Sequence, residues 1–172
     1  MQSMIKGLLD FAQVGGEDVE FEAVELDELF DDMRLDLRSR IKRSGAEVTL
    51  APGLPTVTSW RMGLERVFAN LLDNALKYGG EPPRIEVESR RRDGWTEVLV
   101  RDHGGGVDPA DRERILKDYG RLNPVAEGLG LGLSIVKRIL TRVGGELRLE
   151  TPAEGSGACF VVRLPETPVL RG

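Results

Sequence analysis

The segment from Trp60 to Tyr78 is long and amphipathic, and it narrows the range of possible folds more than any other part of the chain. Its apolar residues recur every three or four positions, which predicts a helix with one buried face. The segments 84–90 and 96–101 instead alternate apolar and polar residues, and Arg92-Asp93-Gly94 between them has the composition of a hairpin turn. A helix beside an antiparallel strand pair favours a layer of helices packed on a sheet.

Periodicity assigns the rest of the chain in the same way. Pro52, Gly53 and Pro55 indicate a loop, after which Ser59 is expected to cap the 60–78 helix at its N-terminus. Other strands are expected at 19–24, 47–50, 146–150 and 158–164, and other helices at 1–14, 27–41, 131–143 and from residue 109 onward. This order predicts an α+β fold, a two-layer sandwich whose mixed, mostly antiparallel sheet is covered on one face by helices.

Composition limits the class of protein. A chain of 172 residues that is 40% hydrophobic can bury a single core. The formal net charge of -5 argues against nucleic acid as a partner, because a surface that binds nucleic acid is basic. No apolar run approaches the roughly 20 residues that span a bilayer and no leader peptide opens the chain, so we expect a soluble chain without direct membrane contact. Cys159 is the only cysteine, which excludes an internal disulfide and favours a cytoplasmic setting.

Three polar side chains share one edge of the expected 60–78 helix. Asn70, Asn74 and Lys77 are spaced three and four residues apart, so they project together, away from the apolar face. Asparagine is a poor helix former, and two of them in mid-helix favour a role other than helix formation. Amide oxygens suit Mg²⁺, which prefers oxygen ligands, while Lys77 and Tyr78 can approach phosphates. A solvated polar face is the alternative interpretation.

A glycine-rich loop follows the expected 96–101 strand. Asp102 ends the strand, and Gly104-Gly105-Gly106 comes directly after it. A carboxylate there can accept a hydrogen bond from an amine such as that of adenine, and glycines let a flat ring approach the backbone. A plain turn explains the same residues.

A second glycine cluster lies at the start of the 131–143 helix. Free N–H groups and the positive end of the helix dipole favour a phosphate at such a position. The Gly-x-Gly-x-Gly spacing and the lack of a preceding strand exclude a dinucleotide-binding Rossmann motif, and a flexible linker is the alternative. The cluster is Gly128-Leu129-Gly130-Leu131-Gly132-Leu133.

Taken in order, these motifs resemble the conserved boxes of the GHKL ATPase superfamily, and of its histidine-kinase branch in particular. Residues 70–78 (NLLDNALKY) resemble the N box, 102–107 (DHGGGV) the first glycine box, 128–133 (GLGLGL) the second, and 144–145 with 155–160 the closing hairpin. The resemblance covers residues 20–165. Residues 1–14 resemble the end of the second helix of the dimerisation and phosphoacceptor hairpin, as in phytochrome-like sensor kinases.

The resemblance implies a Bergerat fold that binds ATP and Mg²⁺. Asp102 would accept the adenine amine in the loop formed with Gly104 and Gly106, and Asn74, assisted by Asn70, would hold the magnesium ion. The neighbouring groups would contact phosphates and ribose, with 108–127 as a mobile lid and the second glycine box as hinge and phosphate cradle. These groups are Lys77, Tyr78, Arg121, Gly128, Leu129, Gly130, Leu131, Gly132 and Leu133.

Asn70 also bears on the type of reaction. Hydrolytic relatives tend to carry glutamate at this position as the base that activates water, so asparagine implies transfer to an acceptor rather than hydrolysis. Asn70, Lys77 and Arg121 are then expected to serve catalysis by positioning the γ-phosphoryl group and neutralising its charge. The lid departs from the family, because Leu116 and Tyr119 stand where phenylalanines are usual.

The phosphate acceptor is expected to lie outside this chain. The family's phosphoacceptor histidine belongs to the first hairpin helix, whereas His103, the only histidine here, falls in the adenine loop. We therefore expect a hairpin fragment (1–16), a protein-histidine kinase catalytic domain (17–166) and a tail (167–172). The expected partners are a phosphoacceptor hairpin, in a parent chain or a separate protein, and a response regulator, with the chain itself a monomer or weak dimer. The alternatives are a non-catalytic ATP-binding regulatory module and an anti-sigma-type protein serine kinase.

Overall fold

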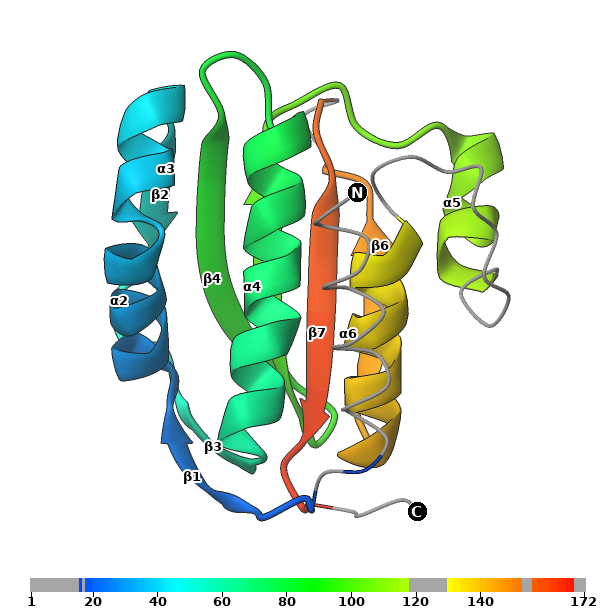
Figure 1. Ribbon diagram of the computed structural model, residues 1–172. Coiled ribbons are helices and arrows are strands. Elements are labelled where there is room, and N and C mark those ends of the chain that lie inside the picture. The colour runs from blue at the N-terminus through cyan, green and yellow to red at the C-terminus, as the bar shows by residue number, and fades with distance from the viewer. Residues whose placement is uncertain (1–15, 17, 118–129, 153–155, 169–172) are drawn as a thin grey trace.

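The computed structural model describes residues 16, 18–117, 130–152 and 156–168. Helices α2, α4 and α6 lie side by side on one face of the main sheet (Figure 1). This confirms the predicted α+β sandwich with helices on one face. In chain order the elements are β1 (Glu22–Glu25), α2 (Leu26–Asp36), α3 (Arg38–Ser44), β2 (Glu47–Leu50), β3 (Thr56–Ser59), α4 (Arg61–Tyr78), β4 (Arg84–Arg92), β5 (Trp95–Asp102), α5 (Pro109–Lys117), α6 (Gly130–Arg142), β6 (Glu146–Glu150) and β7 (Cys159–Pro165).

The main sheet has five strands in the order β2-β4-β5-β7-β6. β2 runs parallel to β4, and the other neighbouring pairs are antiparallel. The predicted hairpin is formed by β4 and β5, with Arg92 opposite Trp95 across the turn. Asp93 and Gly94 in that turn have φ values of 51° and 77°, as a two-residue hairpin turn requires. The sheet is therefore mixed and mostly antiparallel, as predicted.

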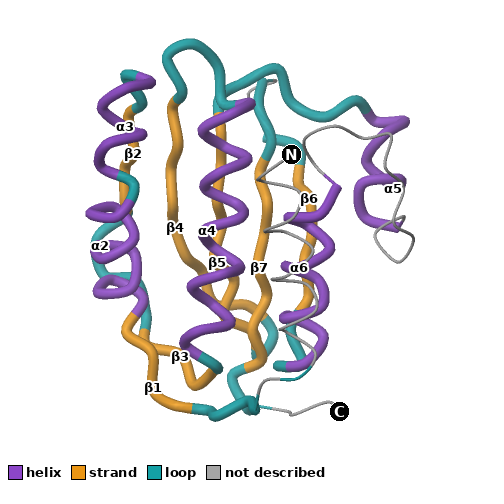
Figure 2. The backbone as a smooth tube through the Cα atoms, in the orientation of Figure 1, coloured by secondary structure: helices purple, strands orange, loops and turns teal. Residues whose placement is uncertain are grey.

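The core lies between the helix layer and this sheet. Figure 2 shows α4 between α2 and α6, crossing the sheet along its length. The rings of Phe30 in α2 and Phe68 in α4 have centroids 4.7 Å apart. Val98 and Val100 of β5, two residues apart, are buried in the same cluster. The apolar residues that recur every 3.6 positions in the helices and every two positions in the strands thus pack in one core.

One predicted helix cap is wrong. Ser59 ends β3, where it pairs with Glu22 of β1, and α4 begins at Arg61 without a side-chain cap. Thr56–Ser59 alternates exposed and buried residues, which is strand behaviour in a segment of only four residues. The pairing of β3 with β1 therefore outweighs the preference of serine for a helix N-cap. β1 itself begins at Glu22, later than the expected start at residue 19.

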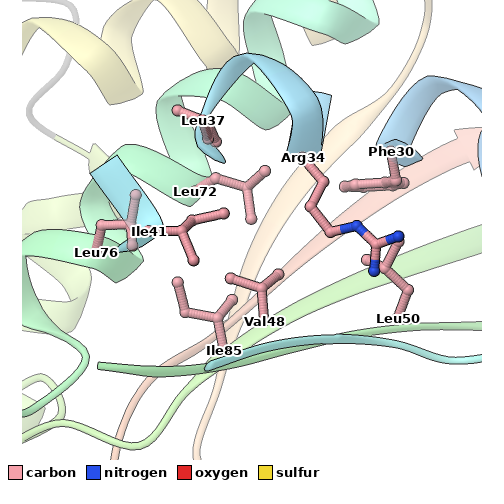
Figure 3. Close-up of a pocket in the computed structure, with 9 residues that line it drawn as sticks. All are labelled: Phe30, Arg34, Leu37, Ile41, Val48, Leu50, Leu72, Leu76 and Ile85. Atoms are coloured by element: carbon pink, nitrogen blue, oxygen red, sulfur yellow. The ribbon is translucent and has the colours of Figure 1, made fainter. Parts of the chain in front are cut away.

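The continuous helix predicted over 27–41 is divided into α2 and α3. Leu37 has φ -84° and ψ -2°, so its ψ departs from the helical value of about -42°. Across this break, Leu37 and Ile41 line the same cavity as Val48 of β2 (Figure 3). The predicted apolar face is therefore correct, but the prediction of one continuous helix is wrong.

Some predictions concern residues outside those described, namely the helix at 1–14 and the part of the lid from 118 to 127. Across the described stretches of chain, no helix is both long enough and apolar enough to cross a membrane.

Candidate functional site

The polar edge of α4 lies against the first turn of α6. Asn70 is half-buried, and its Nδ2 donates a hydrogen bond to the carbonyl oxygen of Arg66 at 2.7 Å. A Cβ atom on Gly132 would lie 2.8 Å from Asn70 Oδ1, so a larger residue there would displace the asparagine. Glycine at 132 therefore lets the N-terminal turn of α6, whose first N–H groups lack helical partners, approach the amide of Asn70.

Asn74 lies one turn further along α4 and is only 6% exposed. Within the described residues its Nδ2 has no hydrogen-bond partner. A buried amide left unpaired costs about 1–3 kcal/mol, which makes Asn74 a candidate for a group that a ligand completes. Rotation of the amide presents its oxygen instead of its nitrogen, so the side chain fits a cation that prefers oxygen ligands.

Asp102 is held at the end of β5 by backbone groups from two segments. Its Oδ1 accepts hydrogen bonds from the N–H of Gly104 at 3.0 Å and from the N–H of Ala158 at 3.2 Å. The N–H of Asp102 in turn donates to the carbonyl oxygen of Ala158 at 2.8 Å. Asp102 as a whole is 6% exposed, so its carboxylate is held in a nearly buried position.

The first glycine loop packs against the C-terminal end of α4. A Cβ on Gly104 would lie 1.7 Å from the carbonyl oxygen of Tyr78, which excludes any other residue without a backbone shift. Gly106 has φ 75° and would meet the carbonyl oxygen of Gly157 at 2.8 Å. The two glycines are therefore required by close backbone approach, and they join the ends of α4, β5 and β7.

Most of the described candidate residues fall in this region. Asn70 contacts Gly132, Tyr78 contacts Gly104, and Asp102 binds the N–H of Gly104, while Lys77 is exposed at the end of α4. The approach of Gly132 to Asn70 places the start of α6 beside the middle of α4.

The remaining candidates are described in part or not at all. Arg121, Gly128 and Leu129 lie outside the described residues, and of Gly130 and Leu131 only the helical backbone is described. Leu133 is fully buried, and its side chain packs in the hydrophobic core.

Two residues of the site were missed from the sequence. Ala158 supplies an N–H to the Asp102 carboxylate, and Gly157, with φ 94°, leaves space where a Cβ would lie 1.9 Å from the carbonyl oxygen of Asp102. The sequence signal for these residues is the glycine of Gly157-Ala158 just before the last strand. A glycine there indicates that another backbone segment comes close, but not which segment.

His103 lies in the first glycine loop and not beside Asn70 and Gly132, where α4 contacts α6. Its N–H donates to the carbonyl oxygen of Arg84 at 3.2 Å. Its Nε2 lies 3.1 Å from Oε1 of Glu86, without the alignment of a hydrogen bond. These contacts fix the strand end beside Asp102.

A separate cavity lies between α2, α3 and the β2–β4 edge of the sheet (Figure 3). Its lining is apolar except for Arg34, and none of the candidate site residues contributes to it. It has no set of polar groups that could orient a nucleotide, so it is distinct from the polar site at the end of α4. The residues that line it are Phe30, Arg34, Leu37, Ile41, Val48, Leu50, Leu72, Leu76 and Ile85.

Known proteins share this sequence pattern and fold. Residues 61–168 match the family described as "Histidine kinase-, DNA gyrase B-, and HSP90-like ATPase". Methanogenesis regulatory histidine kinase FilI from Methanothrix harundinacea is 33% identical over 171 residues, which cover 96% of this chain and 19% of that protein. Phytochrome-like protein Cph1 from Synechocystis sp. is 34% identical over 167 residues, which cover 94% of this chain and 22% of that protein. Full-length ShkA, solved in complex with AMPPNP, is 26% identical with a TM-score of 0.79, over 98% of this chain and 36% of that chain.

This chain spans about a fifth of the length of the two relatives it matches. The family match covers well over half of the chain, from the start of α4 to beyond β7. It includes the polar edge of α4, the Asp102 loop and the start of α6, which the structure brings together. The chain therefore belongs to the histidine kinase-, DNA gyrase B- and HSP90-like ATPase family, as an ATP-binding catalytic domain of the histidine-kinase type.

Proposed function

We propose that the chain binds ATP together with Mg²⁺ and passes the γ-phosphoryl group to a histidine that is not part of this chain. The observation that supports the proposal is that three unlike groups lie along the C-terminal half of α4 and against Gly79, which follows it. These are the buried amide of Asn74, which no described residue bonds through its Nδ2, the carboxylate of Asp102, and the first turn of α6 at Gly132.

Asp102 is proposed to select adenine. Two backbone N–H groups occupy Oδ1, whereas no hydrogen bond from the described residues is made to Oδ2. Oδ2 can therefore accept a hydrogen bond from the exocyclic amine of adenine, which guanine lacks at that position. Gly104 and Gly106 let the loop after Asp102 pack closely against the end of α4 and against Gly157.

Asn74 and Asn70 are proposed to hold the magnesium ion through their amide oxygens, and the bound ion would neutralise charge on the phosphates. Lys77 and Tyr78 at the end of α4, Arg121, and the backbone of 128–133 at the start of α6 would bind the phosphates and ribose.

The asparagine at position 70 supports transfer rather than hydrolysis. An amide does not take up a proton near neutral pH, so Asn70 cannot act as the base that activates water. A neutral imidazole is itself a nucleophile and needs no such base. His103 is held beside Glu86 and Arg84, which supports an acceptor histidine elsewhere.

The wider assignment follows from this proposal. Residues 17–166 would be the catalytic domain, 1–16 the end of a phosphoacceptor hairpin and 167–172 a tail, in a cytoplasmic chain that is itself a monomer or weak dimer. The hairpin, in a parent chain or a separate protein, would receive the phosphoryl group and pass it to a response regulator. The names of the relatives, a regulatory histidine kinase and a phytochrome-like protein, support this setting.

The first test is calorimetric titration of ATP with Mg²⁺ into the protein and into Asp102→Asn. The substitution turns one carboxylate oxygen into an amide that cannot accept from adenine, so affinity should fall about tenfold to 100-fold. Asp93→Asn is the matched control, because Asp93 lies in the β4–β5 turn, at the other end of β5. Equal binding by the wild type and Asp102→Asn would contradict the proposed adenine site.

Transfer is tested by adding an isolated phosphoacceptor hairpin from a sensor kinase with radiolabelled ATP. The label should appear on the hairpin histidine and be lost on acid treatment, because phosphohistidine is acid-labile. Binding without transfer would indicate a regulatory module instead, and acid-stable label on serine would indicate a serine kinase.

A further inference from the structure

Arg112 connects three parts of the molecule that are separated in the sequence. It lies in the first half of α5, and its Nε donates a hydrogen bond to the carbonyl oxygen of Val107 at 3.2 Å. Its Nη1 donates to Oγ1 of Thr151. Val107 directly follows the first glycine loop, and Thr151 directly follows β6. One guanidinium group thus ties α5 to the glycine loop and to the end of β6.

The position of α5 depends on few described contacts. Figure 1 shows α5 apart from the other helices, beyond the β6 edge of the sheet. Asp108 caps the helix, since its Oδ1 accepts the N–H of Ala110 at 2.8 Å, but a cap stabilises a helix without fixing where it lies. Ile115, 9% exposed, joins α5 to the core. Arg112 supplies a polar attachment to two other segments.

The chemistry of arginine suits this attachment. The guanidinium is planar and presents donors in a fixed fork, so one side chain can reach two acceptors in different directions. Both acceptors are neutral oxygens, of a carbonyl and a hydroxyl, and within the described part of the chain Arg112 forms no ion pair. Lysine offers a single ammonium group and would not hold the same two acceptors with the same geometry.

We propose that Arg112 is a positioning residue for the nucleotide, because it holds the glycine loop next to Asp102 and thereby slows nucleotide release. This inference rests on the proposed ATP site. Fixing Val107 fixes the end of the loop whose Gly104 N–H binds the Asp102 carboxylate. A loop held in place before binding loses less conformational freedom when adenine binds.

The attachment itself is tested without nucleotide, by hydrogen exchange of the α5 amides measured with mass spectrometry. Arg112→Gln and Thr151→Val should both speed exchange over 109–117, because each removes a hydrogen bond that holds the helix. Arg148→Gln is the control: Arg148 is an exposed arginine of β6 paired with Glu146 at 3.1 Å, and its loss removes the same charge. Unchanged exchange in both test variants would overturn the proposal.

The effect on the nucleotide is tested by stopped-flow displacement of a fluorescent ATP analogue with excess ATP. Release should be about fivefold to tenfold faster for Arg112→Gln, Arg112→Lys and Thr151→Val. Thr151→Ser keeps the hydroxyl and should behave like the wild type. The double variant Arg112→Gln with Thr151→Val should be no faster than the faster of its two single variants, because Arg112→Gln already removes the contact that Thr151→Val removes.

The outcomes separate the two proposals. If the wild type binds the analogue, Asp102→Asn binds it at least tenfold more weakly, and the Arg112 variants release it at the wild-type rate, the role of Arg112 in nucleotide release is refuted and the ATP site stands. If the wild type binds no nucleotide while exchange over α5 responds to Arg112→Gln, the attachment exists, and both the proposed function and a role in nucleotide release are refuted.

Discussion

Gly104 and Gly105 are neighbours in the first glycine loop, yet the fold constrains them differently. A Cβ on Gly104 would lie 1.7 Å from the carbonyl oxygen of Tyr78, whereas a Cβ on Gly105 would meet nothing within 4 Å. A backbone carbonyl at the end of a packed helix cannot move aside as the tip of a side chain can. Gly104 is therefore required where it stands, and Gly105 is not.

Substitution of the two glycines should show this difference. Gly104→Ala should lower the free energy of unfolding by about 2–3 kcal/mol, because the added methyl group separates the loop from α4. It should also abolish ATP binding. Gly105→Ala should change stability by less than about 0.5 kcal/mol. Urea denaturation followed by circular dichroism measures both, and similar losses in the two variants would contradict the close contact.

Single residues also show how far the sequence can predict the site. Asp102 and the N–H of Gly104 lie two residues apart, so a strand end followed by glycines is visible locally. The hydrogen bond from Ala158 to Asp102 joins residues 56 apart and depends on the pairing of β5 with β7. No local pattern contains that pairing, which is why the role of Ala158 could not be predicted.

At the scale of elements, the type of structure is more predictable than its limits. The 18 residues of α4 repeat their apolar spacing often enough to identify a helix. Thr56–Ser59 offers only four residues, too few to distinguish a strand from a loop before a helix. Leu37 shows the other limit, because a helix break that preserves the apolar face leaves no trace in the pattern.

Four strands of the main sheet are joined by an ionic cluster of Arg90, Glu97, Glu146, Glu150 and Arg163. Glu97 is 3% exposed and accepts hydrogen bonds from Nε of Arg163 at 2.8 Å and Nε of Arg90 at 2.6 Å. Arg163 also donates to Glu146, and Arg90 to Glu150. Glu97 precedes Val98, whose side chain enters the helix-facing core, so the cluster lies on the opposite face of the sheet.

The ionic cluster predicts a loss of stability in acid. Burial raises the pKa of Glu97, but its hydrogen bonds with Arg90 and Arg163 and their charges outweigh burial and lower the pKa below its ordinary value. This stabilisation is therefore fully present above the ordinary glutamate pKa of about 4.3 and is lost as pH falls through the lower folded value.

Glu97→Gln should lower the free energy of unfolding at pH 7 by about 2 kcal/mol, because it leaves two arginines without this partner. The variant should also lose less stability than the wild type between pH 5 and pH 3, pH values chosen to bracket about 4.3. Glu88→Gln, at an exposed position of β4, is the control for removal of one charge. Urea denaturation across this pH range measures the slope, and identical slopes for wild type and Glu97→Gln would contradict the assignment.

At the scale of the whole molecule, the sheet separates two apolar clusters. The larger lies under the helices, and a small one on the opposite face consists of Leu99, Cys159 and Val161. Helices on one face of a mostly antiparallel sheet could be predicted from periodicity and the order of elements. The parallel pairing of β2 with β4 could not, because neither strand carries a local sign of its neighbour's direction.

The rate at which the thiol of Cys159 reacts with a reagent can report the stability of the whole molecule. Its thiol is 6% exposed on β7, a strand paired on both sides, by β5 and by β6. Burial, followed by the charges of Glu150 and Glu88, raises the pKa of the thiol to about 11. The folded protein therefore presents little thiolate at neutral pH, and reaction with a disulfide reagent should require opening of the central strands.

ATP should slow this reaction in proportion to its binding. If labelling of Cys159 proceeds only from the unfolded chain, a ligand that binds the folded state lowers the reactive population by the factor 1 + [ATP]/Kd. At an ATP concentration 100 times Kd, the labelling rate should fall about 100-fold, equivalent to about 2.7 kcal/mol. Asp102→Asn, whose Kd is expected to be tenfold to 100-fold higher, should be protected only about 11-fold to twofold at the same ATP concentration. The contrary outcome is a wild-type labelling rate that does not change with ATP although calorimetry shows binding. The thiol would then be exposed by a local opening of the sheet face away from the helices. That face would move independently of the nucleotide site.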